Sequence, residues 1–140
     1  MTRRRVVITG LGIVSPVGNT VEEAWQNILA GRSGIAHVTK FDASTFPAQI
    51  AGEVKNFDIT DYISAKDARR MDTFIHFGMA AGIQAVRDAG LDKENAADLE
   101  RVGVAIGSGI RGLPLIEETK EEYLAGGIRK VSPFFVPGPI

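Results

Sequence analysis

Few of the side chains that carry out covalent chemistry occur in this sequence, and those present do not combine into a catalytic set. The sequence contains no cysteine, which excludes a cysteine nucleophile, a disulfide and a cysteine-ligated metal within these 140 residues. Its two histidines, His37 and His76, lack an acidic residue at a supporting spacing, so each is better explained as a structural histidine. Ser108 lies between two glycines but not in the Gly-x-Ser-x-Gly spacing of a nucleophile elbow. We therefore predict no catalytic residue and no metal site in this chain.

Two glycine motifs follow apolar runs, as in nucleotide-binding proteins. After Gly10-Leu11-Gly12, the dinucleotide motif needs a third glycine that opens a helix, but Ser15 stands there and Pro16 follows. The second motif, at residues 107–112, lacks the lysine of a phosphate-binding loop. We therefore expect no nucleotide cofactor, and we interpret the glycines as residues of tight turns.

Basic side chains form the group whose spacing most suggests binding. Lys66, Arg69 and Arg70 recur at the i, i+3 and i+4 positions of a predicted helix, and Arg129 and Lys130 form a second basic pair. They are either solvated charges that keep the protein soluble or a docking surface for an acidic partner. The residues alone leave both explanations open.

Two apolar runs that end in glycines predict the sheet that would position these residues. Residues 6–8, with an extension toward residue 14, and residues 101–106 are rich in β-branched side chains. Such runs are typical of strands buried on both faces of a parallel sheet, which indicates the α/β class. Residues 107–112 would then form a turn at the carboxyl edge of the sheet, where ligands bind in open α/β folds.

Capping residues predict two helices in the first half of the chain. Thr20 with Glu23 forms a capping box for a helix that stops near Gly31. Ser64 with Asp67 marks the start of a second helix that carries the first basic cluster. The irregular stretch between them indicates loops with a short strand or hairpin near residues 48–54.

Two further helices are predicted in the second half. Residues 71–89 are apolar nearly all round, with a face of small residues, which is typical of a buried helix that here would end at Gly90. Asp72 at its start would favour the dipole of this helix. A last helix with one acidic side begins near Leu113 and ends at Gly126-Gly127.

The composition is that of an ordinary globular protein. With 44% hydrophobic and 24% charged residues, 140 residues suffice for one domain with a core. A net charge of −1 argues against binding to nucleic acid or to an acidic membrane, and no run approaches the length of a membrane span. We expect a cytoplasmic protein. The apolar end at residues 132–140, with an aromatic pair, suggests that the natural chain continues.

Six motifs, in order and with matching spacing, together resemble the N-terminal part of the β-ketoacyl-acyl-carrier-protein synthases, the elongating condensing enzymes. They are RRVVITGLG at residues 4–12, SPVGNT at 15–20, GRSGI at 31–35, MDTF at 71–74, AIGSGI at 105–110 and SPFFVP at 132–137. The tail resembles the type II enzymes most. The resemblance implies a thiolase-like fold of layered α/β/α/β/α order, of which residues 1–140 would be only the N-terminal part, and a homodimer.

The resemblance also implies an activity, the decarboxylative condensation of an acyl chain with malonyl-acyl-carrier protein in fatty-acid elongation. In such acyltransferases a cysteine thiolate takes the acyl chain, backbone N–H groups hold the oxyanion, and two histidines assist decarboxylation. The family's cysteine and histidines lie beyond the matched region, so we carry over no catalytic residue and expect the chain alone to be inactive.

Two other roles carry over by position. Ile110 would line the acyl pocket, and Phe135 would close that pocket from the neighbouring subunit. The basic positions match those that meet the acidic acyl carrier protein, namely Lys66, Arg69, Arg70, Arg129 and Lys130. Two alternatives remain. One is a non-catalytic partner subunit resembling the chain-length factors of polyketide synthases, and the other, less favoured, is a dinucleotide-binding module.

Overall fold

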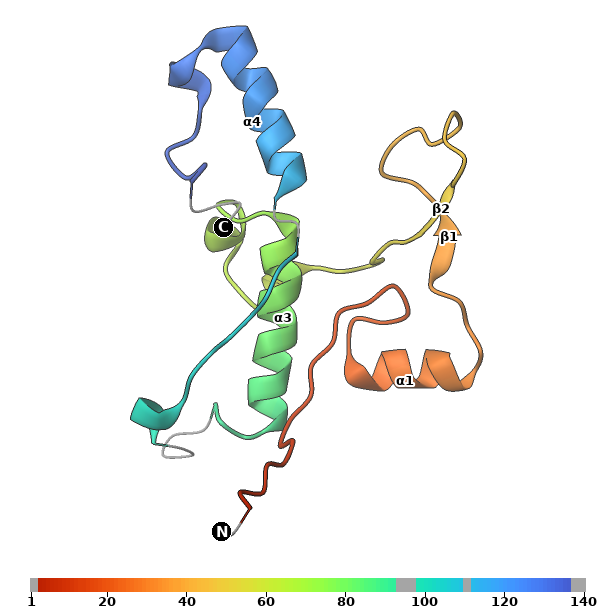
Figure 1. Cartoon of the computed structure of the whole chain (residues 1–140), viewed down its shortest axis with the longest axis vertical. Helices are drawn as coiled ribbons and strands as arrows, with labels where there is room; N and C mark the ends of the chain where they lie inside the picture. Colours follow the sequence, from red (N-terminus) through yellow and green to blue (C-terminus); the bar gives the residue numbers. More distant parts are fainter. Residues whose placement is uncertain (1–2, 93–97, 110–111, 137–140) are drawn as a thin grey trace. The chain divides into compact units, whose positions relative to one another are not determined.

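The computed structural model describes residues 3–92, 98–109 and 112–136, and Figure 1 traces its helices and strands. Contacts group the chain into two compact units, residues 1–57 with 80–98 and residues 58–79 with 99–140. In chain order the elements are α1 (Val21–Leu29), β1 (Ile35–His37), β2 (Ile50–Gly52), η1 (Ile59–Asp61), α2 (Ala65–Ala68), α3 (Thr73–Asp88), η2 (Leu99–Arg101), α4 (Leu113–Gly126) and η3 (Ile128–Lys130), where η denotes a short 3₁₀ helix.

Helix α1 forms where the capping box predicts it. The hydroxyl of Thr20 accepts a hydrogen bond from the backbone N–H of Glu23 at 3.2 Å. The Glu23 carboxylate in turn accepts from the backbone N–H of Asn19 at 2.7 Å, so two N–H groups at this helix start are satisfied. Gly31 takes a φ of 65° just after the helix, which confirms the predicted stop.

An antiparallel hairpin follows α1 in the same unit. Strand β1 pairs with β2 in the register Ile35 opposite Gly52, Ala36 opposite Ala51 and His37 opposite Ile50. This confirms a hairpin that includes residues 50–52, although its first strand lies earlier than the predicted region. Glu53, just after β2, accepts hydrogen bonds from the backbone N–H and the hydroxyl of Thr39 and so ties the two arms together.

The glycines at 10 and 12 serve close packing. A Cβ on Gly10 would overlap backbone atoms of Ala85 and Ala89, and one on Gly12 would overlap those of Ala81 and Ala85. Neither glycine lies in a turn or takes a positive φ, so the interpretation as tight-turn residues is wrong for this pair. The face of small residues that the sequence predicts for α3 allows this close approach.

The two runs expected to be buried strands form no strand in this structure. The side chains of Val6, Ile8 and Val104 are 92%, 83% and 83% exposed. The sheet found in the described residues is the β1–β2 hairpin, so neither run has a hydrogen-bonded neighbour strand. Near the first run, the backbone N–H groups of Leu11 and Ile13 instead donate to side chains of α3 at 2.8 and 3.2 Å. Because β-branched composition favours a strand only beside a pairing partner, the prediction of buried strands here is wrong.

The predicted helix over residues 71–89 is confirmed as α3, and Gly90 follows its end with a φ of 67°. Its expected full burial is wrong: Ala80 is the buried residue of this helix, while Val86 is 42% exposed. An apolar helix is buried only when elements pack around it, and among the residues described few do so.

Helix α4 confirms the last predicted helix. It runs from Leu113 to Gly126, and Gly127 follows with a φ of 70°. Thr119 is its buried residue, while the acidic side chains are exposed as expected. Within the described part of the chain, no helix has the length and apolar character to cross a membrane.

Candidate functional site

The first basic cluster is built on α2 and the turn that follows it. Ser64 caps α2, because its hydroxyl oxygen accepts from the backbone N–H of Asp67 at 3.1 Å and donates to the Asp67 carboxylate at 2.6 Å. The helix ends at Ala68, so Arg69 and Arg70 follow it and do not continue one helical face. This corrects the predicted helical spacing of the cluster. Its side chains are nevertheless exposed, as a docking surface requires.

Both arginines are restrained by neighbours. The guanidinium carbon of Arg70 lies 4.6 Å from the centroid of the Phe134 ring. A cation over an aromatic face gains about 0.5–1 kcal/mol at an exposed position. The Nε of Arg69 donates to the carbonyl of Ala65 at 3.1 Å, which fixes the near end of its guanidinium. The cluster is therefore partly ordered before any partner arrives.

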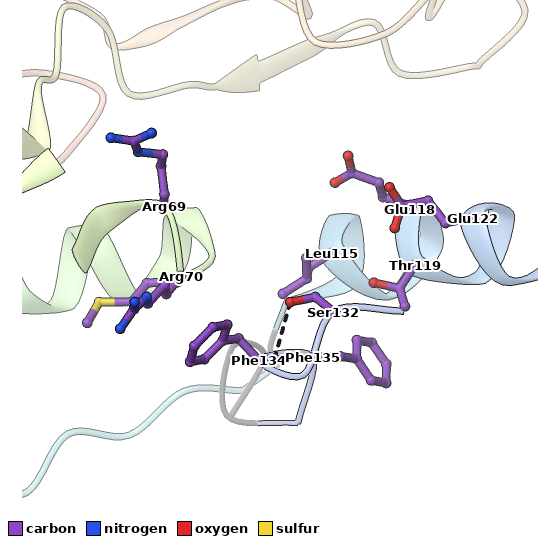
Figure 2. A pocket seen from close by; sticks show the side chains of 10 residues that line it. Arg69, Arg70, Leu115, Glu118, Thr119, Glu122, Ser132, Phe134 and Phe135 are labelled. Atoms are coloured by element: carbon purple, nitrogen blue, oxygen red, sulfur yellow. Dashed lines mark hydrogen bonds between the residues drawn. The ribbon is translucent and has the colours of Figure 1, made fainter. Parts of the chain in front are cut away.

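Arg69 and Arg70 line a hollow of about 220 Å³ that carries charges of both signs. Figure 2 shows the arginines on one side of this hollow and Glu118 and Glu122 of α4 on the other. The remaining lining residues are Met71, Leu115, Thr119, Ser132, Phe134 and Phe135. A partner that inserts an anionic group here meets two guanidinium groups and two carboxylates.

The second basic pair lies on η3. Arg129 and Lys130 are both exposed, and the stem of Lys130 covers Gly126, where an added Cβ would meet its Cγ at 2.5 Å. Neither residue lines the hollow that holds Arg69 and Arg70. The structure thus places the five predicted docking residues on the surface and brings the arginine pair together at one hollow.

The structure describes one of the two predicted pocket residues, Phe135. Ile110 lies outside the described residues. Phe135 is half-buried, and it lines both the charged hollow and an apolar groove beside α4 and η3. Its role toward a neighbouring subunit stays a prediction.

An apolar cavity lies at the segment that precedes Ile110. It measures about 390 Å³ and lies between Ile106–Ser108 and the first turns of α3. The glycine at 78 leaves room there, since an added Cβ would reach the Ile106 side chain only at 3.8 Å. The cavity shows that this segment faces an apolar space large enough for several methylene groups.

His76 and Asp72 have structural partners. The Nε2 of half-buried His76 lies 2.9 Å from the carbonyl oxygen of Ala68, which agrees with a structural histidine. The sequence suggested that Asp72 favours the dipole of α3. Its carboxylate also accepts a hydrogen bond from the backbone N–H of Leu115 in α4, so Asp72 contacts both helices. No group of three metal-ligating side chains occurs among the residues that the structure describes.

The shifted pKa values lie outside the hollow. Hydrogen bonds from the Thr60 hydroxyl and backbone lower the pKa of Asp58, which caps η1. Hydrogen bonds from the Thr39 hydroxyl and backbone likewise lower the pKa of Glu53, and those from the Ser44 backbone and side chain lower that of Asp42. Asp42 and Asp58 are acceptors in local turns and Glu53 is an acceptor across the hairpin, so these shifts reflect folding and not acid–base chemistry.

Sequence reasoning missed the glutamate pair and the ring of Phe134 in this hollow, and the contact of Asp72 with α4 beside it. Glu118 and Glu122 could have been found, because an i, i+4 spacing places both on one side of α4. The contact of Phe134 with Arg70 and that of Asp72 with Leu115 could not be predicted from local spacing. Each of them joins residues that are far apart in the sequence.

Comparison with known proteins gives consistent matches over the whole chain. Residues 3–139 match the family model described as "Beta-ketoacyl synthase, N-terminal domain". The chain is 58% identical over 142 residues to 3-oxoacyl-[acyl-carrier-protein] synthase 2 of Vibrio harveyi, covering 100% of this chain and 34% of that protein. It therefore spans about a third of the length of the curated relatives it matches.

Two solved structures have a similar fold. The ishigamide ketosynthase/chain length factor gives a TM-score of 0.77 at 30% identity, over 99% of this chain and 34% of that one. A type II PKS acyl-carrier protein in complex with its ketosynthase bound to the hexaketide gives 0.78 at 26% identity, over 99% and 37%. These likenesses confirm the predicted thiolase-like ketosynthase fold.

Proposed function

Because this chain belongs to the β-ketoacyl synthase N-terminal domain family, we propose that it is the N-terminal part of a 3-oxoacyl-[acyl-carrier-protein] synthase. The 58% identity over the whole chain to such a synthase is the observation that carries this proposal. The reaction is the condensation of acyl-acyl-carrier protein with malonyl-acyl-carrier protein, with loss of CO₂, in fatty-acid elongation. The proposed whole enzyme is an acyltransferase.

This chain does not supply the nucleophile of the proposed reaction. None of the 140 residues is a cysteine, so a thiolate that takes the acyl chain must come from other residues of the enzyme. This chain would supply scaffold, a wall of the acyl pocket and part of the surface that receives the carrier protein.

The pocket wall is assigned to Ile110 and Phe135. The apolar cavity at Ile106–Ser108 supports the first, since it lies just before that residue in the chain. Half-burial of Phe135 beside an apolar groove supports the second. Each methylene of an acyl chain buried against such a wall gains about 0.8 kcal/mol, so its shape can select chain length.

The docking surface is assigned to the exposed basic residues. Acyl carrier protein is the proposed partner, and one of the similar solved structures is a ketosynthase in complex with such a protein. Since the net charge of the chain is only −1, its share of the attraction for an acidic partner must come from local clusters. The proposed residues are Lys66, Arg69, Arg70, Arg129 and Lys130. We further propose a cytoplasmic homodimer.

A chimaeric enzyme tests the function. Residues 3–139 replace the matching third of the Vibrio harveyi synthase, and the product measured is 3-oxoacyl-acyl-carrier protein. We expect the chimaera to condense both substrates and the 140-residue chain alone to release no CO₂ from malonyl-acyl-carrier protein. A folded but inactive chimaera, or steady condensation by the pure chain, would contradict the proposal.

The same chimaera tests the pocket wall. Ile110→Phe narrows the proposed pocket, so we expect the preferred acyl substrates to become shorter, while Ile110→Val preserves the preference. An unchanged chain-length profile for Ile110→Phe would remove Ile110 from the wall.

The second candidate function is that of a non-catalytic partner subunit. The similarity to the structure of a ketosynthase/chain length factor supports this candidate. The two candidates differ in the residue at the nucleophile position of the whole protein. Sequencing of the gene around this segment decides between them: a cysteine supports the synthase, and another residue supports the partner subunit.

A further inference from the structure

Asp72 connects the starts of two helices in the unit of residues 58–79 and 99–140. Its backbone carbonyl accepts from the N–H groups of Ile75 and His76 at 3.0 and 3.3 Å, where α3 begins. Its carboxylate accepts from the backbone N–H of Leu115 at 3.4 Å, in the first turn of α4. One residue thus holds two helix starts together.

Helix α4 has no cap of its own. The capping position is Gly112, which takes a left-handed conformation with φ of 32° and has no side chain to offer. Pro114 has no N–H, and the N–H of Ile116 already donates to the Gly112 carbonyl at 3.0 Å. Leu115 therefore carries a first-turn donor that needs an acceptor from outside the helix.

The Asp72 carboxylate supplies that acceptor and a charge. A side-chain oxygen at a helix start satisfies a free N–H, and a negative charge there is favoured by the helix dipole. The first turn of α4 contains no acidic residue. Within the described residues, Asp72 is the capping group that the structure provides for this helix.

The position of this contact links two proposed functional segments. Asp72 comes two residues after Arg70, and Leu115 lines the same hollow as Arg69 and Arg70. Helix α4 begins directly after the glycine-rich segment whose first residues line the apolar cavity. The contact therefore fixes the docking segment to the helix that follows the proposed pocket wall.

We propose that Asp72 is a positioning residue for carrier-protein docking, acting through the first turn of α4. The proposal rests on the proposed function, because it takes the arginine hollow to be part of the carrier-protein surface. Loss of the contact lets α4 move relative to Arg69 and Arg70, so the hollow loses its shape while its charges stay.

Amide hydrogen exchange of the chimaeric enzyme tests the contact itself. In Asp72→Ala we expect the Leu115 amide to exchange on the order of fivefold faster, the effect of losing one helix cap. Asp72→Asn keeps an acceptor oxygen and should preserve most of the protection. Asp58→Ala is the matched control, because Asp58 caps η1 in the same unit and should leave Leu115 unchanged. Unchanged exchange at Leu115 in Asp72→Ala overturns the proposal.

Kinetics of the chimaeric enzyme separate a positioning role from a purely structural one. We expect Asp72→Ala to raise KM for acyl-acyl-carrier protein several-fold and to leave KM for a small acyl thioester unchanged. In Asp72→Asn, which keeps an acceptor oxygen, KM for acyl-acyl-carrier protein should return close to its original value. A rise in KM when Arg69 and Arg70 are reversed, with none in Asp72→Ala, overturns this inference alone. If neither change raises KM, the docking surface in the proposed function is overturned as well.

Discussion

Two arginines and two glutamates line one hollow, and their charges together set the electrostatic field in it. Unit charges about 4 Å apart near a protein surface interact by up to about 4 kcal/mol, and less with solvent and salt. The four side chains are exposed, so their effects on stability are small. Their effect on the approach of a charged partner can be larger, because each carboxylate cancels part of the positive field that a carrier protein would meet.

Removal of the two carboxylate charges should therefore strengthen docking. In the chimaeric enzyme, Glu118→Gln with Glu122→Gln is expected to lower KM for acyl-acyl-carrier protein by roughly two- to fivefold. Steady-state kinetics at low and high salt measure this, and the gain should shrink as salt rises.

A matched control is available on the same helix. Glu117 and Glu121 belong to α4 and carry the same charge, but they do not line the hollow. Glu117→Gln with Glu121→Gln should change KM less. Equal gains from both pairs would show that only the net charge of α4 matters.

The contents of this hollow were only partly predictable. Basic residues at 66, 69 and 70 were visible as a cluster because they are close in the sequence. The ring of Phe134 under Arg70 was not, because a cation–π contact between distant residues depends on how α4 and the tail fold back. Local spacing identifies charged groups but not the neighbours that restrain them.

At the scale of elements, caps were more informative than apolar runs. Thr20 and Ser64 each accept from the backbone N–H of the third residue on, as the capping signatures predicted. A helix satisfies its hydrogen bonds within itself, so local sequence can specify it. A strand needs a distant partner, and the runs at residues 6–8 and 101–106 show that apolar composition alone does not supply one.

Close packing of Gly12 on α3 gives a prediction about stability. A Cβ on Gly12 would overlap backbone atoms of Ala81 and Ala85, which cannot rotate away as a side chain could. Gly12→Ala should therefore destabilise the chain by about 1–3 kcal/mol. Urea unfolding followed by circular dichroism measures this change.

Gly82 is the matched control within α3. It faces open space, with no neighbouring atom within 4 Å of an added Cβ, and its φ is not positive. Gly82→Ala should stabilise the chain by about 0.5–1 kcal/mol, because alanine loses less backbone entropy in a helix. Destabilisation by both substitutions would contradict the packing argument.

The hairpin should respond to acid through Glu53. Hydrogen bonds from Thr39 lower the pKa of this carboxyl below its ordinary value of 4.5, so ionised Glu53 stabilises the fold. That contribution is complete above the ordinary value and is lost as pH falls through the lowered pKa. The protection factor of the Thr39 amide, which is the ratio of its intrinsic to its observed exchange rate at each pH, should therefore fall in acid.

Two substitutions check the origin of this pH dependence. Glu53→Gln should remove it, because the amide does not titrate in that range. Thr39→Val removes the hydroxyl donor and should move the pKa of Glu53 back up, as measured by its side-chain NMR shift. An unchanged titration in Thr39→Val would show that the hydroxyl is not the main cause.

At the scale of the whole molecule, the order and spacing of the six motifs predicted the fold more closely than the hydrophobic periodicity did. The resemblance indicated the thiolase-like fold, which the solved structures confirm, whereas periodicity alone indicated only the α/β class. The exposed Val6 and Val104 show why: a β-branched run forms a buried strand only beside a pairing partner, and neighbouring sequence does not supply one. A fold that depends on distant pairing is better identified from a set of spaced motifs than from any one element.

The near-neutral charge of this chain bears on how it would attract an acidic partner. Sixteen basic and seventeen acidic residues give these 140 residues a net charge of −1, so attraction of an acidic carrier protein to this part of the enzyme depends on local clusters. Arg69→Glu with Arg70→Glu should raise KM for acyl-acyl-carrier protein in the chimaera on the order of tenfold, but not KM for a small acyl thioester. Arg4→Glu with Arg5→Glu changes the net charge equally at exposed positions in the other unit. If both pairs raise KM alike, net charge rather than a docking surface explains the effect. If only the first pair does, and salt abolishes the difference, carrier-protein recognition depends on the hollow.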